Sequence, residues 1–248
     1  MDGKEQIRKE VWAKLTRVAF PDSRFHWDFT AFIPDYHGSD LCTELICGMD
    51  AYRSATNILV TPDNNLVSFR ASCIKDGKLL IVPSYAIGRG FWQLTREDVP
   101  EGQEEYSATL DGLERFANPY PITTVPLENR PQLLVTGASV LNSDGVRLSN
   151  GPSYFDLEWL ILISLGLVDE GTPVVAAVHD CQVVDYPCDP QPYSVVADMI
   201  VVPSQVIPIP RHYERPTKII WDQIPWYIVN DIPLLRAIYQ EAHQSLKK

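Results

Sequence analysis

The segment from Gly145 to Asp156, GVRLSNGPSYFD, combines residue types that a phosphate-binding loop uses. Gly145 and Gly151 allow the backbone to approach an anion closely, and Arg147 carries a planar, permanently charged guanidinium group that suits phosphate oxygens. The apolar residues 154–167 predict a helix directly after the loop. Backbone N–H groups at the start of such a helix attract anions, because the helix dipole is positive there.

An ordinary surface turn is the alternative interpretation of the same segment. Ser153 stands immediately before the predicted helix, and serine caps helices for purely structural reasons. The spacing of the residues is compatible with both interpretations.

Strands and helices alternate along the chain and must position this loop. Buried strands are expected before and after it, over residues 132–137, 172–179 and 197–202, and an earlier strand, helix and strand are expected over residues 55–63, 65–75 and 78–83. This order predicts a three-layer α/β/α sandwich around a mainly parallel sheet, an α/β fold. Ligands of such open sheets bind at the carboxyl ends of the strands.

His179 and Asp180 follow one of the predicted strands and would lie at such a carboxyl end. A histidine beside an aspartate can act as a general acid or base near neutral pH. The alternative is that His179 only forms hydrogen bonds with loop backbone. A separate interpretation of the whole chain is an enzyme that needs no nucleotide. Such an enzyme would use His179, Asp180 and Asp185.

Two further segments carry residues that suit a ligand site. Residues 20–37 are rich in aromatic side chains, which predicts a pocket wall, a dimer surface or a loop folded onto the core. Residues 84–92 contain two glycines around Arg89, where the backbone can approach a ligand. Residues 95–129 are rich in Pro, Glu and Asp and are expected at the edge of the sheet.

Composition narrows the class of protein. The 248 residues, 45% of them hydrophobic, suffice for one α/β domain over residues 1–248. A net charge of −11 argues against non-specific nucleic-acid binding, and five cysteines without close pairs argue against a disulfide framework or a zinc site. Without a membrane-length apolar run or a secretory signal, we expect a cytoplasmic monomer or homodimer that binds a small molecule.

The loop segment resembles the signature of the 5-formyltetrahydrofolate cyclo-ligase (methenyltetrahydrofolate synthetase) family, approximately G-x-R-L-G-x-G-x-G-Y-Y-D. The matching residues are Gly145, Arg147, Leu148, Gly151, Tyr154 and Asp156. The resemblance extends over nearly the whole chain and implies a Rossmann-like fold of the NagB/RpiA/CoA-transferase type. It also implies ATP- and magnesium-dependent conversion of 5-formyltetrahydrofolate to 5,10-methenyltetrahydrofolate, a reaction of one-carbon metabolism.

The resemblance implies a role for each matching position. The phosphates of ATP would be held by Lys4, Arg8, Gly145, Arg147 and Gly151. Asp156 would bind magnesium, Tyr154 would border the substrate, and Asp63 would stand in for a folate-binding glutamate. The residues expected to take part in catalysis are Arg147, Tyr154, His179 and Asp180.

Several positions depart from the cyclo-ligase pattern. Ser149 and Ser153 replace glycines, Pro152 replaces a lysine, and Ser194 replaces an aspartate four residues before Asp198. Proline removes a backbone donor, and loss of the lysine removes a cation beside the triphosphate. Residues 154–158, 178–185, 203–207 and 215–221 resemble a paralogous, cyclo-ligase-like branch that has been linked to thiamine metabolism. The chain departs even from this branch at Ser149, Pro152, Tyr193 and Ser194. In this alternative the chain lacks cyclo-ligase activity and binds or transforms another small molecule in the same pocket.

Overall fold

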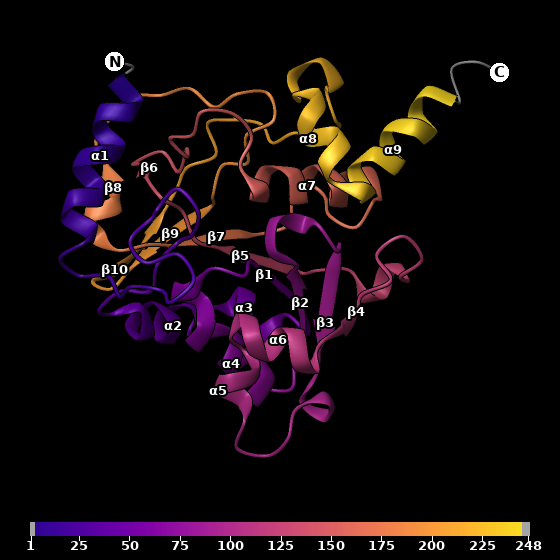
Figure 1. Cartoon of the computed structure of the whole chain (residues 1–248), viewed down its shortest axis with the longest axis horizontal. Helices are drawn as coiled ribbons and strands as arrows, with labels where there is room; N and C mark the ends of the chain where they lie inside the picture. Colours follow the sequence, from indigo (N-terminus) through magenta and orange to yellow (C-terminus); the bar gives the residue numbers. More distant parts are fainter. Residues whose placement is uncertain (1–2, 245–248) are drawn as a thin grey trace.

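The computed structural model describes residues 3–244 and is built around an eight-stranded sheet (Figure 1). The strand order is β10-β9-β7-β5-β1-β2-β3-β4. The parallel strands are β1 (Asn57–Val60), β2 (Leu79–Pro83), β5 (Leu133–Thr136), β7 (Val174–Ala177) and β9 (Met199–Val202). Antiparallel strands form the edges, namely β10 (Gln205–Pro208), β3 (Phe91–Leu94) and β4 (Asn118–Pro119). The central strands are short runs of Val, Leu and Ile, as expected for strands covered on both faces.

Helices cover both faces of this sheet. On the lower face in Figure 1 lie α2 (Ser39–Cys47), α3 (Asp50–Ser54), α4 (Val67–Lys75), α5 (Glu104–Ser107) and α6 (Leu110–Phe116). On the upper face lie α7 (Tyr154–Ser164), α8 (Trp226–Asp231) and α9 (Pro233–Gln244). Each layer packs its own apolar core, around Phe69 below and Trp159 above. The three-layer α/β/α sandwich predicted from the sequence is therefore confirmed.

The first helix and a second, small sheet lie beside the main sheet. Helix α1 (Gly3–Leu15) packs Val11 against Val140 and Leu148, next to the pair of two-residue strands β6 (Leu141–Asn142) and β8 (Val183–Val184). Strands this short leave no periodic signal in the sequence. Strand β10 pairs antiparallel with β9 at the edge of the main sheet and ends at Pro208, and an edge strand tolerates proline.

The chain leaves the two central strands in opposite directions. From β1 it passes through α4 to β2, and from the neighbouring β5 it passes through α7 to β7. In open α/β sheets ligands bind in the crevice at the carboxyl ends of the strands where the order reverses. The topology therefore predicts a binding site after β1 and β5.

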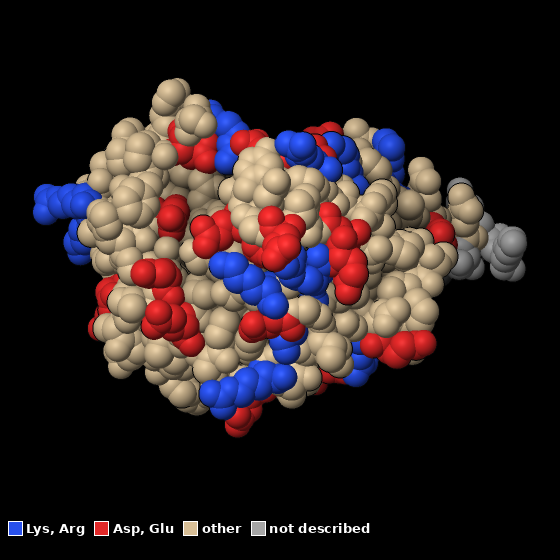
Figure 2. Space-filling model, turned by 90° about the horizontal axis from the view of Figure 1, so that it is seen from below, with Lys and Arg blue, Asp and Glu red and all other residues tan. Residues whose placement is uncertain are grey.

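Charged residues of both signs share the lower helical face of the molecule. Figure 2 shows Lys and Arg interspersed with Asp and Glu on this face, without a broad basic area of the kind that binds nucleic-acid phosphates. Within residues 3–244, no helix has both the length and the apolar character needed to cross a membrane.

Candidate functional site

A cavity of about 640 Å³ opens at the carboxyl ends of β1, β2 and β5, where the strand order reverses. Its lining includes residues 61–64 after β1, residues 84–86 after β2 and residues 136–140 after β5. The loop before α7 and the first turns of that helix complete the wall. The volume is in the range of sites for small organic molecules.

Stacked aromatic rings form one wall of the cavity. Phe25 stacks on Phe32 with centroids 5.3 Å apart and on Tyr85 with centroids 5.6 Å apart, with interplanar angles of 20° and 19°. The Tyr85 hydroxyl donates a hydrogen bond to the carbonyl oxygen of Ala31 at 3.1 Å. Residues 20–37 thus contribute a pocket wall, and the flat stack suits a planar ligand.

Asp22 fixes this aromatic segment to the sheet. Its carboxylate accepts hydrogen bonds from Nε and Nη2 of Arg24 and from Nδ2 of Asn64, which lines the cavity. The bonds from Arg24 hold the pKa of Asp22 well below its usual range. The wall is therefore tied to the loop after β1 by a charged, nearly buried group.

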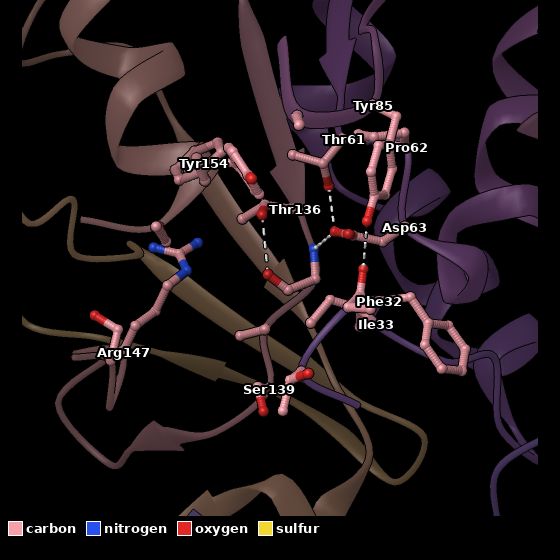
Figure 3. A pocket seen from close by; sticks show the side chains of 18 of the residues that line it. Phe32, Ile33, Thr61, Pro62, Asp63, Tyr85, Thr136, Ser139, Arg147 and Tyr154 are labelled. Atoms are coloured by element: carbon pink, nitrogen blue, oxygen red, sulfur yellow. Dashed lines mark hydrogen bonds between the residues drawn. The ribbon is translucent and has the colours of Figure 1, made fainter. Parts of the chain in front are cut away.

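Asp63 joins the loops that follow β1 and β5. Its Oδ2 accepts hydrogen bonds from Oγ1 of Thr61 at 2.5 Å and from the backbone N–H of Gly137 at 2.8 Å (Figure 3). A Cβ at position 137 would lie 2.8 Å from this oxygen, so only glycine allows the approach. Burial raises the pKa of Asp63, and the two hydrogen bonds oppose the rise.

Arg147 faces Asp63 from the other side of the cavity (Figure 3). Its Nη1 donates to the carbonyl oxygen of Val195 at 2.8 Å, and its guanidinium group lies 4.6 Å from the ring centroid of Phe155. Its Nη2 is buried and has no hydrogen-bond partner among the described residues. Burial lowers the pKa of Arg147, but arginine stays charged in proteins. The cavity thus contains a fixed cation with an unused donor.

The start of α7 is closed by its own side chains. Ser153 is the N-cap, and its hydroxyl accepts from the backbone N–H of Asp156, while Asp156 Oδ2 accepts from the backbone N–H and the hydroxyl of Ser153. The other oxygen of Asp156 accepts from the N–H of Val195 at 2.8 Å. The capping role considered for Ser153 is confirmed.

These bonds decide how well Asp156 suits a magnesium ion. The side chain is 1% exposed, both of its oxygens have protein partners, and burial raises its pKa. Within the described part of the chain, no cluster of three or more His, Cys, Asp or Glu residues is arranged to hold a metal. Magnesium requires free, preferably anionic oxygens, so this arrangement does not fit an ion bound by Asp156.

The two glycines of the loop lie in different surroundings. Gly145 has a φ of 77° and lies outside the cavity lining, and a Cβ there would be 3.0 Å from the carbonyl oxygen of Ala197. Gly151 has a φ of 119° and open space around it. Its carbonyl accepts from the hydroxyl of Ser149 at 2.7 Å, and the adjacent Pro152 lines the cavity. The surroundings of Gly145 indicate a role in folding.

Helix α1 carries Lys4 and Arg8 and contacts a residue of the cavity lining through Trp12. Its Trp12 donates from Nε1 to the hydroxyl of Ser139 at 2.7 Å, and Ser139 lines the cavity. The guanidinium group of Arg8 lies 6.0 Å from the Trp12 ring, and its Nε is buried without a partner among the described residues. Lys4 interacts electrostatically with Tyr193. The structure therefore connects α1 with the cavity through Trp12.

His179 and Asp180 lie at the end of β7, as expected, but outside the cavity lining. The Nδ1 of His179 accepts from the backbone N–H of Cys181 at 3.1 Å, and Asp180 accepts from the hydroxyl of Ser204 at 2.7 Å. Burial lowers the pKa of His179. His179 thus forms a hydrogen bond with the backbone of its own loop, as in the second interpretation that the sequence allowed for this residue.

Two other charged groups considered from the sequence have partners elsewhere. Arg89 forms an ion pair with Glu114. Asp198 lies at the amino end of β9, where it pairs with Arg211 and Arg215. Neither Arg89 nor Asp198 lines the cavity.

Tyr154, Glu158 and Tyr227 also belong to the cavity. Tyr154 is half-exposed and borders the cavity, whereas Glu158 and Tyr227 were not foreseen. Glu158 is the single charged residue in the otherwise apolar run LEWLILI, and it is 2% exposed. A lone acid in a buried helix is a sequence signal that could have identified this residue.

The sheet topology and the cavity define a Rossmann-like α/β protein with a cavity of small-molecule size at the point where the strand order reverses. The chain belongs to the 5-formyltetrahydrofolate cyclo-ligase family, whose sequence profile matches residues 1–203.

Similar proteins agree with this assignment. The methenyltetrahydrofolate synthase domain-containing proteins of Bos taurus and Homo sapiens are each 28% identical over 249 residues, which cover 98% of this chain. The matches span 64% and 63% of those proteins, so the chain spans less than two thirds of their length. The structure of Aquifex aeolicus 5,10-methenyltetrahydrofolate synthetase has a TM-score of 0.53 and 16% identity, covers 86% of this chain and 96% of its own, and shows the shared fold.

We predict that Gly145→Ala destabilises the protein by about 1–3 kcal/mol, because the new Cβ combines a strained positive φ with a backbone clash. Gly77→Ala is the matched control, since Gly77 also has a positive φ but open space around it. Urea unfolding of both variants checks this. Equal losses in the two variants would contradict a packing role for Gly145.

We predict that Asp22→Ala lowers the stability by about 1–3 kcal/mol, because it removes charge-assisted hydrogen bonds at a nearly buried site. Protease cleavage within residues 20–37 should become faster, since the aromatic segment loses its link to Asn64. Limited proteolysis followed by mass spectrometry measures this. An unchanged cleavage rate would show that the aromatic stack alone holds the segment.

Proposed function

We propose that the protein binds 5-formyltetrahydrofolate in the cavity and converts it to 5,10-methenyltetrahydrofolate with ATP. The observation that carries this proposal is the cavity itself, because it lies where the strand order reverses and combines a flat aromatic wall with Asp63 and Arg147 on facing sides. A reduced folate offers a planar heterocycle for the wall and polar groups for the two charged side chains. Family membership agrees with this ligand class.

The reaction requires two steps that the cavity can assist. The γ-phosphoryl group of ATP passes to the formyl oxygen of the substrate, and N10 then attacks the formyl carbon while phosphate leaves and the five-membered ring closes. Negative charge develops on the transferring group in the first step. A cation with a free donor, fixed by contacts to Val195 and Phe155 as Arg147 is, stabilises such charge without reorganising.

We also propose that residues of α1 and of the loop before α7 contact the nucleotide. Arg8 has a buried Nε without a partner, which suits a phosphate oxygen, and Lys4 lies one helical turn before it. Gly151 lies in the open part of the loop beside the cavity. Magnesium supplies Lewis-acid chemistry in phosphoryl transfer, but the arrangement at Asp156 does not fit the ion, and we assign it no ligands.

A second candidate function keeps the cavity without the ATP chemistry. It is favoured by the start of α7, where Ser153 and Asp156 use each other's hydrogen-bonding groups and neither oxygen of Asp156 is without a protein partner. Pro152 adds no backbone donor at the same place. Under this alternative the protein binds a folate or another heterocycle, such as a thiamine-related compound, and does not close the methenyl ring.

The activity is tested by incubating the protein with 5-formyltetrahydrofolate, ATP and magnesium and following methenyltetrahydrofolate formation by absorbance. We expect turnover that falls about tenfold to a hundredfold in Arg147→Ala, because the variant removes the charge on which the transition state depends. Arg130→Ala is the matched control, since Arg130 is exposed, pairs with Asp169 at the surface and lies outside the cavity lining. An inactive wild-type protein would exclude the cyclo-ligase reaction.

Thermal unfolding with single ligands separates the two candidates. For the cyclo-ligase we expect both 5-formyltetrahydrofolate and ATP to stabilise the protein, by about 2.7 kcal/mol at a concentration about 100 times the dissociation constant. Stabilisation by the folate without any effect of ATP would favour the second candidate. The absence of both effects would contradict the proposed ligand class.

A further inference from the structure

Two buried polar atoms in the cavity residues have no hydrogen-bond partner within residues 3–244. They are Oε2 of Glu158 and Nη2 of Arg147. Glu158 lies one turn after Tyr154 on α7, and Arg147 belongs to the loop that precedes this helix. Buried polar groups are normally hydrogen-bonded, so two unused groups in one cavity indicate a missing partner.

The fold itself does not require an acid at position 158. Ser153 and Asp156 cap the helix, and Leu157 and Trp159 on either side of Glu158 are core residues. No hydrogen bond or ion pair joins the Glu158 carboxyl group to another described residue. Since a buried carboxyl group without a partner lowers stability, a leucine would serve the fold better.

The charges around Glu158 determine which chemistry it offers. Burial, and then the neighbouring Asp63 carboxyl group, raise the pKa of Glu158 well above its usual value. Arg147 opposes this rise, and Asp156 adds to it. A carboxyl group that keeps its proton can donate a hydrogen bond through its O–H.

We propose that Glu158 is a specificity-determining residue whose carboxyl O–H, together with Nη2–H of Arg147, donates hydrogen bonds to a carbonyl-type oxygen of the ligand. The two donors come from different elements but line one cavity. They select a ligand with an acceptor at this point and disfavour one that presents an N–H group or a cation, because donors would then face donors. The inference rests on the proposed function, since 5-formyltetrahydrofolate carries both ring and formyl oxygens of this kind.

The test compares three variants by their affinity for 5-formyltetrahydrofolate without nucleotide, from acidic to alkaline pH. Glu158→Gln keeps an N–H donor that cannot lose a proton, and Glu158→Leu removes the donor. Glu101→Gln is the control, because Glu101 is exposed and outside the cavity. We expect the affinity of the wild type and of Glu101→Gln for the folate to fall as the pH rises, and the affinity of Glu158→Gln to be independent of pH. Glu158→Leu should bind the folate about tenfold more weakly than the wild type.

Two results of the binding experiment would overturn the inference. The first is equal affinity of Glu158→Leu and wild type, which would show that the ligand does not use the carboxyl group. The second is a wild-type affinity that increases with pH and is lost in Glu158→Gln, because an ionised Glu158 would then accept a hydrogen bond from the ligand.

A measurement without ligand separates this inference from the proposed function. Because the pKa of Glu158 is raised in the folded protein, its contribution to stability is fully present below the unfolded value of about 4.5 and is lost as the pH rises through the folded value. Wild type should therefore lose stability relative to Glu158→Gln over that range, as measured by urea unfolding. A constant difference would overturn the inference. The expected loss in a protein that does not bind the folate would support a neutral Glu158 and overturn the proposed function.

Discussion

The cavity depends on the hydrogen bonds by which Asp63 joins the ends of β1 and β5. Its carboxylate accepts one hydrogen bond from the hydroxyl of Thr61, directly after β1, and another from the backbone N–H of Gly137, directly after β5. The chain departs from these strands in opposite directions, so the loops would otherwise separate at this point. One carboxylate therefore holds the crevice in shape while facing the ligand space, and position 137 must be glycine because any Cβ would meet this oxygen.

The phosphate-loop sequence is the clearest case in which local chemistry changes the meaning of a motif. Arg147 keeps a buried donor available, as a phosphate or carbonyl oxygen requires. Ser153 and Asp156 instead satisfy each other and close the start of α7. Arg147 in this loop thus has a donor that can bind a ligand, whereas Asp156 of the signature caps helix α7. A chain can therefore keep the aspartate of its family's signature and use it to cap a helix.

The sequence predicted the sandwich and most of its elements because buried Val, Leu and Ile runs alternate with helical patterns over long stretches. Asp63, Arg147 and Tyr154, which the sequence singled out, lie together in the lining of the cavity. The sequence could not show that Gly145 is packed against Ala197, or that His179 contacts its own loop, since both facts depend on contacts between distant or irregular segments. Glu158 was not predicted as a site residue, because one acidic residue does not change the helical pattern of the apolar residues around it. Its burial in the helix nevertheless lowers the stability of the fold.

Two of the stacked rings in the aromatic wall, Phe25 and Phe32, belong to residues 20–37, which precede the first strand of the main sheet and lie outside its repeating strand–helix units. The opposite side of the cavity is built by the loops and helix that hold the sheet together. Substitutions in the wall therefore need not disturb the packing of the strands. The aromatic contribution to ligand binding is thus encoded outside the strands of the sheet, so a family built on this plan can change this wall while its central sheet stays the same.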